Sequence, residues 1–201
     1  MKIFSVSFGQ KFPIASCKVK NNETGKFVPA ILYEYDCNDP EDIREIESLS
    51  NEWKFKNAIL DGMNTKKNVA EKYGLKAPSS FYALKDSKDQ IIGISYLFKR
   101  TGKVSNDACL TVKFIETKPN KIYKYAGQAM LASHALNALN DRYDKFEIRF
   151  PTDEATLFYK DKCGFKDGED KYTLEMATIE IKKFLRKMFF RTHGRIKDIR
   201  R

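Results

Sequence analysis

Histidine is scarce in this chain of 201 residues, and its cysteines are not paired in sequence. The two histidines are His134, inside a helical pattern, and His193 near the end of the chain, so histidine-based catalysis has little support. The four cysteines form no C-x-x-C pair, whereas zinc sites need four ligands at short, paired spacings. We therefore expect no metal centre, and we expect reduced, mostly buried thiols, as in a cytoplasmic protein.

Long apolar stretches are also missing. No run of ~18 uncharged apolar residues is present, so no segment predicts a membrane-spanning helix. The apolar stretch near the start of the chain is too short for a signal peptide. With 10 Gly, 6 Pro, 42% hydrophobic and 32% charged residues, the composition excludes the collagen-like and disordered classes and favours one globular domain.

Positive charge is concentrated at the C-terminal end. The net charge is +10, but residues 182–201 hold nine Lys and Arg against one acid, Asp198, a local balance of +8 that leaves +2 for residues 1–181. A basic chain of this kind suggests a nucleic-acid partner. Here that inference applies to the C-terminal segment alone, because the rest is nearly neutral.

The C-terminal segment has the pattern of a basic amphipathic helix. Apolar residues recur at positions i, i+3, i+4, i+7 and i+8, and basic residues fall between them. The apolar set is Ile181, Phe184, Leu185, Met188 and Phe189, and the basic set is Lys182, Lys183, Arg186 and Lys187. The apolar stripe packs against the domain or a second subunit in a homodimer, or the helix contacts an anionic membrane surface or RNA.

Hydrophobic periodicity predicts strands that alternate with helices from residue 28 onward. Asp39 and Pro40 have the pattern of an N-cap and a first helical residue. Gly93, inside an apolar run, predicts a bulge or a close backbone approach. The expected elements are strand 28–35, a helix from 40, a short helix 58–68, a hairpin 80–100 that turns at 85–90, strand 108–116, helix 126–140, strand 145–150, a helix from about 152 to 162 and strand 171–176.

This order predicts an α/β class with crossover connections. Residues 1–27 are ambiguous, because residues 2–8 suggest an edge strand and residues 21–25 suggest a turn. We expect an N-terminal strand or extension at 1–27, a domain at 28–178 and the basic tail at 179–201.

The segment Lys124-Tyr125-Ala126-Gly127-Gln128-Ala129 follows a predicted strand and opens a helix. A glycine there lets the backbone approach a ligand, and the free amides of the first helical turn point at an anion. On this segment alone, plain packing of the helix on the sheet explains the glycine equally well.

A second segment makes the pattern more specific. Thr152, Ala155, Phe158, Tyr159, Gly164 and Phe165 follow the next predicted strand in order. Together with the strand order, the two segments resemble the motifs of the GNAT superfamily of acyl-CoA-dependent N-acetyltransferases. The first motif of that family is Gln/Arg-x-x-Gly-x-Gly/Ala, and the second is Asn-x-x-Ala-x-x-Leu-Tyr followed by Gly-Phe. The resemblance covers about residues 28–176.

The resemblance implies a mixed, mostly antiparallel sheet flanked by helices. It implies transfer of an acetyl group from acetyl-CoA to a primary amine by direct attack, without a metal. Tyr159 then protonates the CoA thiolate, and Glu116 deprotonates the amine, directly or through water. The implied cofactor-binding residues are Lys124, Tyr125, Ala126, Gly127, Gln128 and Ala129 for the pyrophosphate, Ile115 and Thr117 on the strand that pairs with the pantetheine arm, and Thr152.

The sequence departs from the family pattern in several places. Lys124 replaces Gln or Arg, Thr152 replaces Asn, and the loop 117–123 is longer than usual. Five positions rather than four separate Tyr159 from Gly164, so the end of this helix must differ locally.

Two other functions stay open. One is a degenerate domain that binds acyl-CoA, or nothing, and acts as an interaction module through its tail. The other is a tail-driven RNA- or membrane-binding protein whose domain is a scaffold. The acceptor amine is not determined, because residues 43–76, where this superfamily builds its acceptor site, have mixed charge.

Overall fold

The structure is a computed structural model that describes residues 12–100, 107–120, 122–191, 194 and 196–200. The predicted edge strand at 2–8 and His193 lie outside these residues. In chain order the elements are β1 (Phe12–Asn21), β2 (Phe27–Tyr35), α1 (Pro40–Glu47), α2 (Lys56–Tyr73), β3 (Ser79–Asp86), β4 (Ile91–Arg100), β5 (Cys109–Thr117), β6 (Tyr123–Lys124), α3 (Ala126–Asn140), β7 (Lys145–Arg149), α4 (Asp153–Leu157), the π-helix η1 (Phe158–Cys163), β8 (Lys166–Asp167), β9 (Thr173–Ala177), α5 (Thr178–Arg191) and β10 (Lys197–Asp198).

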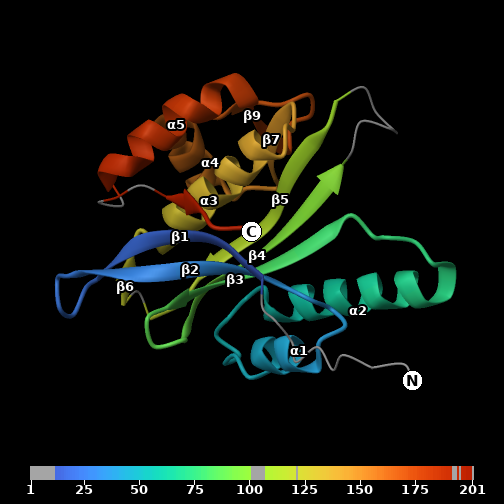
Figure 1. The fold of residues 1–201 in the computed structure, drawn as a ribbon. Helices are drawn as coiled ribbons and strands as arrows, with labels where there is room; N and C mark the ends of the chain where they lie inside the picture. Colours follow the sequence, from blue (N-terminus) through green and yellow to red (C-terminus); the bar gives the residue numbers. More distant parts are fainter. Residues whose placement is uncertain (1–11, 101–106, 121, 192–193, 195, 201) are drawn as a thin grey trace.

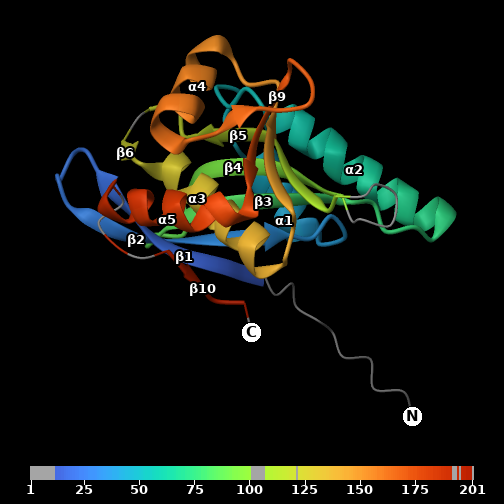
Figure 2. The ribbon, with the colours of Figure 1, turned by 90° about the horizontal axis from the view of Figure 1, so that it is seen from above.

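The strands form one mixed sheet with helices on both faces (Figures 1 and 2). Within the described residues the strand order is β10-β1-β2-β3-β4-β5-β7-β9-β8, and β6 pairs with β1. The pairs along this order are antiparallel except β5 with β7, which is parallel. This arrangement confirms the predicted fold class.

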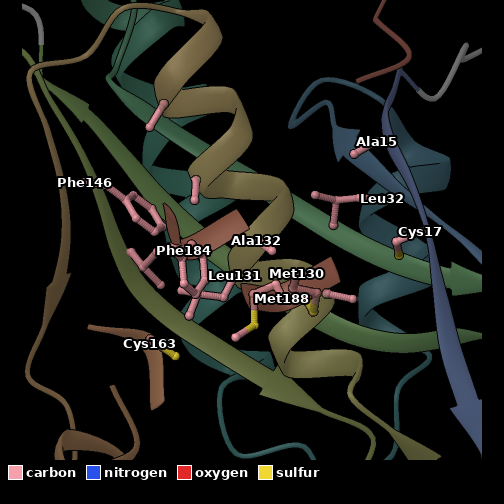
Figure 3. Close-up of a cluster of buried hydrophobic side chains, with 14 of the residues drawn as sticks. Ala15, Cys17, Leu32, Met130, Leu131, Ala132, Phe146, Cys163, Phe184 and Met188 are labelled. Atoms are coloured by element: carbon pink, nitrogen blue, oxygen red, sulfur yellow. The ribbon is translucent and has the colours of Figure 1, made fainter. Parts of the chain in front are cut away.

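Each face of the sheet has its own hydrophobic core. The larger core lies beneath α3 and α5 and includes Met130, Leu131 and Phe146 (Figure 3). The smaller core lies beneath α1 and α2 and contains Ile59 and Phe81. Among the described residues, no helix is both long enough and apolar enough to cross a lipid bilayer.

Local signals explain where the first helices begin and end. Asp39 caps α1 as predicted, because its carboxylate accepts a hydrogen bond of 2.8 Å from the Glu41 amide. Helix α2 extends from 56 to 73, well beyond the expected 58–68, and ends at Gly74, whose φ of 63° suits a residue without a side chain. Strand β1 occupies part of the segment that the sequence left ambiguous.

Helix α5 forms over the predicted amphipathic segment, and its apolar stripe faces the domain. Ile181, Phe184 and Met188 are fully or almost fully buried in the larger core, and α5 packs against α3. The basic side chains Lys182, Lys183, Arg186 and Lys187 are exposed. Three of the five predicted stripe residues therefore pack within the chain itself, whereas Leu185 is half-buried and Phe189 is 45% exposed. Beyond α5, β10 pairs with β1.

Gly93 marks both features that its sequence position predicts. The pairing of β3 with β4 shifts register between Leu84 and Lys85, beside Gly93. A Cβ atom at Gly93 would lie 2.3 Å from the sulfur of the buried Met130, closer than van der Waals contact allows. The missing side chain therefore lets α3 pack closely on β4.

His134 lies at the centre of a buried polar contact between α3 and the sheet. Its Nε2 is 2.9 Å from the Ser95 hydroxyl, and its ring centroid is 4.8 Å from that of Tyr82. Burial, together with the positive charge of Lys99, lowers the pKa of His134 to about 3. The imidazole is therefore neutral in the folded protein at neutral pH.

The buried histidine predicts that the protein loses stability in mild acid. Below pH ~6.5 the unfolded chain binds a proton at His134 and the folded chain does not, so stability falls as the pH drops toward 3. Between pH 7.5 and pH 5 we expect a loss of about 2 kcal/mol, measured by urea unfolding. The double variant Ser95→Ala/His134→Leu removes both polar partners and should flatten this slope. An unchanged slope would contradict the assignment.

Candidate functional site

Strands β5 and β7 part in the middle of the sheet. Their parallel pairing begins with Cys109 opposite Lys145 and ends with Val112 opposite Ile148. The pairing of β5 with β4 continues to Thr117, with a register shift at Lys113. The second half of β5 therefore has a neighbour on one side only, and its other edge offers backbone groups to a ligand.

A cleft of about 410 Å³ lies at the point where the strands part. Side chains from the end of β5, the start of α3, α4 and η1 line it. The lining residues are Ile115, Thr117, Gly127, Gln128, Leu131, Thr152, Glu154, Ala155, Phe158 and Tyr159. Its volume is within the range typical of small-molecule sites.

The N-terminus of α3 opens into this cleft without a cap. Tyr125 takes the N-cap position with a φ of 71° and provides no side-chain hydrogen bond to the helix. The helical hydrogen bonds begin with Ala129 N–H, which donates to the Tyr125 carbonyl at 2.9 Å. The amides that precede it have no carbonyl within the helix, so they suit an anion such as a phosphate.

Gly127 lies in the first turn of α3, opposite Thr117 of β5. A Cβ atom at this position would lie 3.5 Å from the Thr117 methyl group, an ordinary contact across the cleft. Gly127 and Gln128 line the cleft, whereas Ala126 and Ala129 face the core. The contribution of Ala126 and Ala129 is therefore to the backbone and to packing.

Lys124 and Tyr125 lie beside the cleft and do not line it. Lys124 is exposed on β6, and its Nζ is 5.1 Å from the centroid of the Tyr125 ring. The Tyr125 ring stacks on Phe27 of β2 at a centroid distance of 6.3 Å. Short pairing of β6 with β1 holds this segment in place, with Lys20 opposite Lys124.

Tyr159 stands at the inner wall of the cleft in a π-helical turn. Its side chain is 9% exposed and packs against Phe158 and Phe165 with centroid distances of 5.6 and 5.9 Å. Burial raises the pKa of the Tyr159 phenol to about 12, so the phenol keeps its proton at neutral pH. A neutral phenol in a cleft is suited to donate that proton.

The π-helix accounts for the extra residue before Gly164. Helix η1 runs from Phe158 to Cys163 and ends at Gly164, which has a φ of 88°. A π-helical turn accommodates one residue more than an α-helical turn, and such turns are frequent at functional sites. With the five-residue spacing, Tyr159 lines the cleft and Gly164 still ends the helix.

Thr152 caps α4 at the edge of the cleft. Its hydroxyl accepts a hydrogen bond of 3.3 Å from the Ala155 amide. The chain turns sharply between β7 and this cap, because Phe150 adopts a left-handed φ of 52°. Thr152 therefore performs the capping for which Ser, Thr, Asn and Asp are all suited.

Glu116 has a position that the sequence does not predict. Its two carboxylate oxygens accept hydrogen bonds of 2.8 and 2.9 Å from the amides of Lys54 and Phe55. It does not line the cleft, and its strand neighbours Ile115 and Thr117 do. Because side chains alternate along a strand, Glu116 lies on the α1–α2 face, where it anchors the segment before α2.

Within the described residues, no group of three or more His, Cys, Asp or Glu side chains is arranged to hold a metal ion. No protein-family model and no curated protein matches the sequence. Solved structures match the fold.

Three of these structures illustrate the likeness. Apo FdhC, a nucleotide-linked sugar GNAT, matches with a TM-score of 0.56 and 16% identity over 92% of this chain and 100% of that chain. AtaTR bound with AcCoA matches with a TM-score of 0.53 and 17% identity over 76% and 96%. A GNAT-family acetyltransferase from Listeria monocytogenes 4b F2365 matches with a TM-score of 0.53 and 12% identity over 80% and 99%. The chain has the GNAT fold.

In this GNAT fold the cleft brings together six of the predicted site residues: Ile115, Thr117, Gly127, Gln128, Thr152 and Tyr159. Lys124, Tyr125, Ala126, Ala129 and Glu116 lie outside its lining. The cleft also contains Leu131, Glu154, Ala155 and Phe158, which were not predicted to bind a ligand. Leu131 is one helical turn beyond Gly127, so helical spacing alone places it on the same face.

Proposed function

We propose that this GNAT-fold chain transfers an acetyl group from acetyl-CoA to a primary amine by direct attack. The observation that supports it best is the cleft at the parted strands, which combines an uncapped helix N-terminus with a buried, neutral tyrosine. The first feature suits a diphosphate, and the second suits a thiolate that must gain a proton. The similar AtaTR structure is described as bound with AcCoA.

The residues of the cleft fit acetyl-CoA. The amides at the start of α3, with Gly127 and Gln128, would hold the pyrophosphate. The free edge of β5 near Ile115 and Thr117 would hydrogen-bond the amide-containing pantetheine arm as an added strand. Acetyl-CoA supplies an activated thioester, so the chain itself has to bind, orient and exchange protons.

Two residues would exchange those protons. Tyr159 donates its phenolic proton to the departing CoA sulfur. Glu116 receives the proton of the amine through a water, since each carboxylate oxygen keeps a second lone pair beyond the one bound to an amide. We also propose a cytoplasmic location, which is supported by four buried cysteines that are not joined in disulfides.

Calorimetric titration with acetyl-CoA, followed by release of CoA thiol in the presence of primary amines, tests the proposed function. We expect saturable binding and amine-dependent release. Binding without release to any amine would favour an acyl-CoA-binding interaction module. Absence of binding at millimolar acetyl-CoA would eliminate both.

Substitution of Glu116 separates its two possible contributions. The Glu116→Gln variant removes the proton acceptor and retains one amide contact, so we expect a lower kcat with little change in acetyl-CoA affinity. Steady-state kinetics over a pH series measures this. A change confined to the KM of the amine would instead mean that Glu116 only positions residues 54 and 55.

A further inference from the structure

The two residues that follow the last β5–β7 pair are both cationic. Pairing stops at Val112 opposite Ile148, and the next residues are Lys113 on β5 and Arg149 on β7. Like charges at facing positions of two strands repel each other. This pair of positions therefore opposes continued pairing at the point where the strands part.

Lys113 and Arg149 act on the face of the sheet opposite the cleft. Phe146 and Ile148 of β7 point into the core beneath α3, so Glu147 and Arg149 point the other way. The Nζ of Lys113 is 5.9 Å from the centroid of the Phe98 ring, and its side chain is half-buried. Burial and the positive charge of Arg149 lower the pKa of Lys113, with Glu147 opposing them.

The carboxylates nearby are already engaged. Glu147 accepts a hydrogen bond of 3.0 Å from Thr111 and lies 3.6 Å from Arg100. Asp170, which is within electrostatic range of Arg149, accepts hydrogen bonds from the Tyr172 amide and the Thr173 hydroxyl.

The guanidinium of Arg149 has unused hydrogen-bonding capacity. In the part of the chain that the structure describes, its Nε is buried and makes no hydrogen bond. The salt bridges found among the described residues include neither Arg149 nor Lys113. A buried guanidinium N–H normally has a partner, and its planar fork matches a carboxylate or a phosphate.

We propose that the amine acceptor is a small molecule with an anionic group, a phosphate or a carboxylate, that binds between Lys113 and Arg149. This inference rests on the proposed acetyl transfer. The two cations lie beside the gap between β5 and β7, on the face of the sheet opposite the cleft. An anion bound there would place an attached amine near this gap. Two half-buried cations favour such an acceptor over a neutral amine of the same shape.

Matched amines test this. The pairs are glucosamine 6-phosphate with glucosamine for the phosphate, and tyrosine with tyramine for the carboxylate. We measure release of CoA thiol and, independently, binding of each amine to the CoA-loaded protein by calorimetry. In at least one pair the anionic member should bind and react at least ~10-fold better than its neutral partner. The pair that responds identifies the anion.

Variants assign the preference to the two cations. Lys113→Ala and Arg149→Ala should each lower the ratio of anionic to neutral amine reactivity toward a value of one. The affinity for acetyl-CoA should stay unchanged in both variants. Lys182→Ala, which removes an exposed lysine on α5, serves as the control and should retain it. Arg149→Lys keeps the charge and loses the planar fork, so it should retain part of the preference.

Three outcomes would overturn the inference. One is a neutral amine that binds as well as its anionic partner in both pairs, or no binding by either anionic amine. The second is a preference that survives both alanine substitutions. The third is a loss of acetyl-CoA affinity in these variants, which would assign the cations to the donor site. Failure of the proposed function is distinct, because then acetyl-CoA itself does not bind or no amine releases CoA.

Discussion

The Tyr159→Phe variant should bind acetyl-CoA normally and turn over about 10²- to 10⁴-fold more slowly than the wild type. The substitution removes one hydroxyl from the wall of the cleft and keeps the ring that packs against Phe158 and Phe165. Loss of turnover would therefore report loss of the proton donor, not loss of packing. Calorimetry gives the affinity, and release of CoA thiol gives kcat.

The pKa of Tyr159 adds a second expectation. Because burial raises this pKa to about 12, ionisation of the phenol should not lower wild-type turnover between about pH 6 and pH 10.

Tyr73→Phe is the matched control for the Tyr159→Phe substitution, because Tyr73 is 61% exposed at the end of α2 and does not line the cleft. A Tyr159→Phe protein with full turnover would exclude this residue as the acid.

The Gly127→Asp variant should fold and lose acetyl-CoA affinity by at least ~100-fold. A side chain at this position has room, since its Cβ would lie 3.5 Å from the Thr117 methyl group. An acidic residue in the first turn of a helix also stabilises the helix through the helix dipole. The same carboxylate would occupy the site proposed for the pyrophosphate, and like charges in contact cost several kcal/mol.

Gly127→Asn separates charge from size. It has nearly the shape of aspartate without the charge, so we expect a much smaller loss of affinity. Thermal unfolding verifies that both variants fold. Equal losses in the two variants would mean that crowding, not repulsion, closes the site, and unchanged affinity in Gly127→Asp would remove the start of α3 from the binding site.

Much of the fold could be predicted from periodicity and capping signals. Asp39 and Pro40 predict the start of α1, and two apolar runs on either side of a polar turn predict the strands around Tyr82 and Ile94. Strand β1 is harder to predict because, besides the adjacent β2, it pairs with β6 and β10, which lie far along the chain. The expected end of α2 at 68 is too early because its last turns are polar and mostly exposed, so apolar periodicity stops before the helix ends at the left-handed Gly74.

Residues of the cleft could be predicted where a local motif fixes their position. Prediction is poorer where pairing between distant segments fixes the position of a side chain. Gly127 and Tyr159 could be predicted to line the cleft because the position of each is fixed by the helix in which it lies. The hydrogen bonds of Glu116 to the amides of residues 54 and 55 could not be predicted, because they span about 60 positions of sequence and leave no local signal. The facing positions of Lys113 and Arg149 depend on the β5–β7 register in the same way.

The pairing of β10 with β1 has a consequence for synthesis of the chain. Ala15 lies opposite Asp198, so the two residues are joined only after the intervening 182 residues have been made. Strand β1 also pairs with β6, which leads directly into the helix that opens the cleft. During translation, the edge of β1 that pairs with β10 stays unpaired until β10 has been made. The face of α3 that α5 covers is likewise exposed until α5 has been made. The elements that pack around the cleft are therefore completed late. Folding that depends on such distant contacts is expected to be slow.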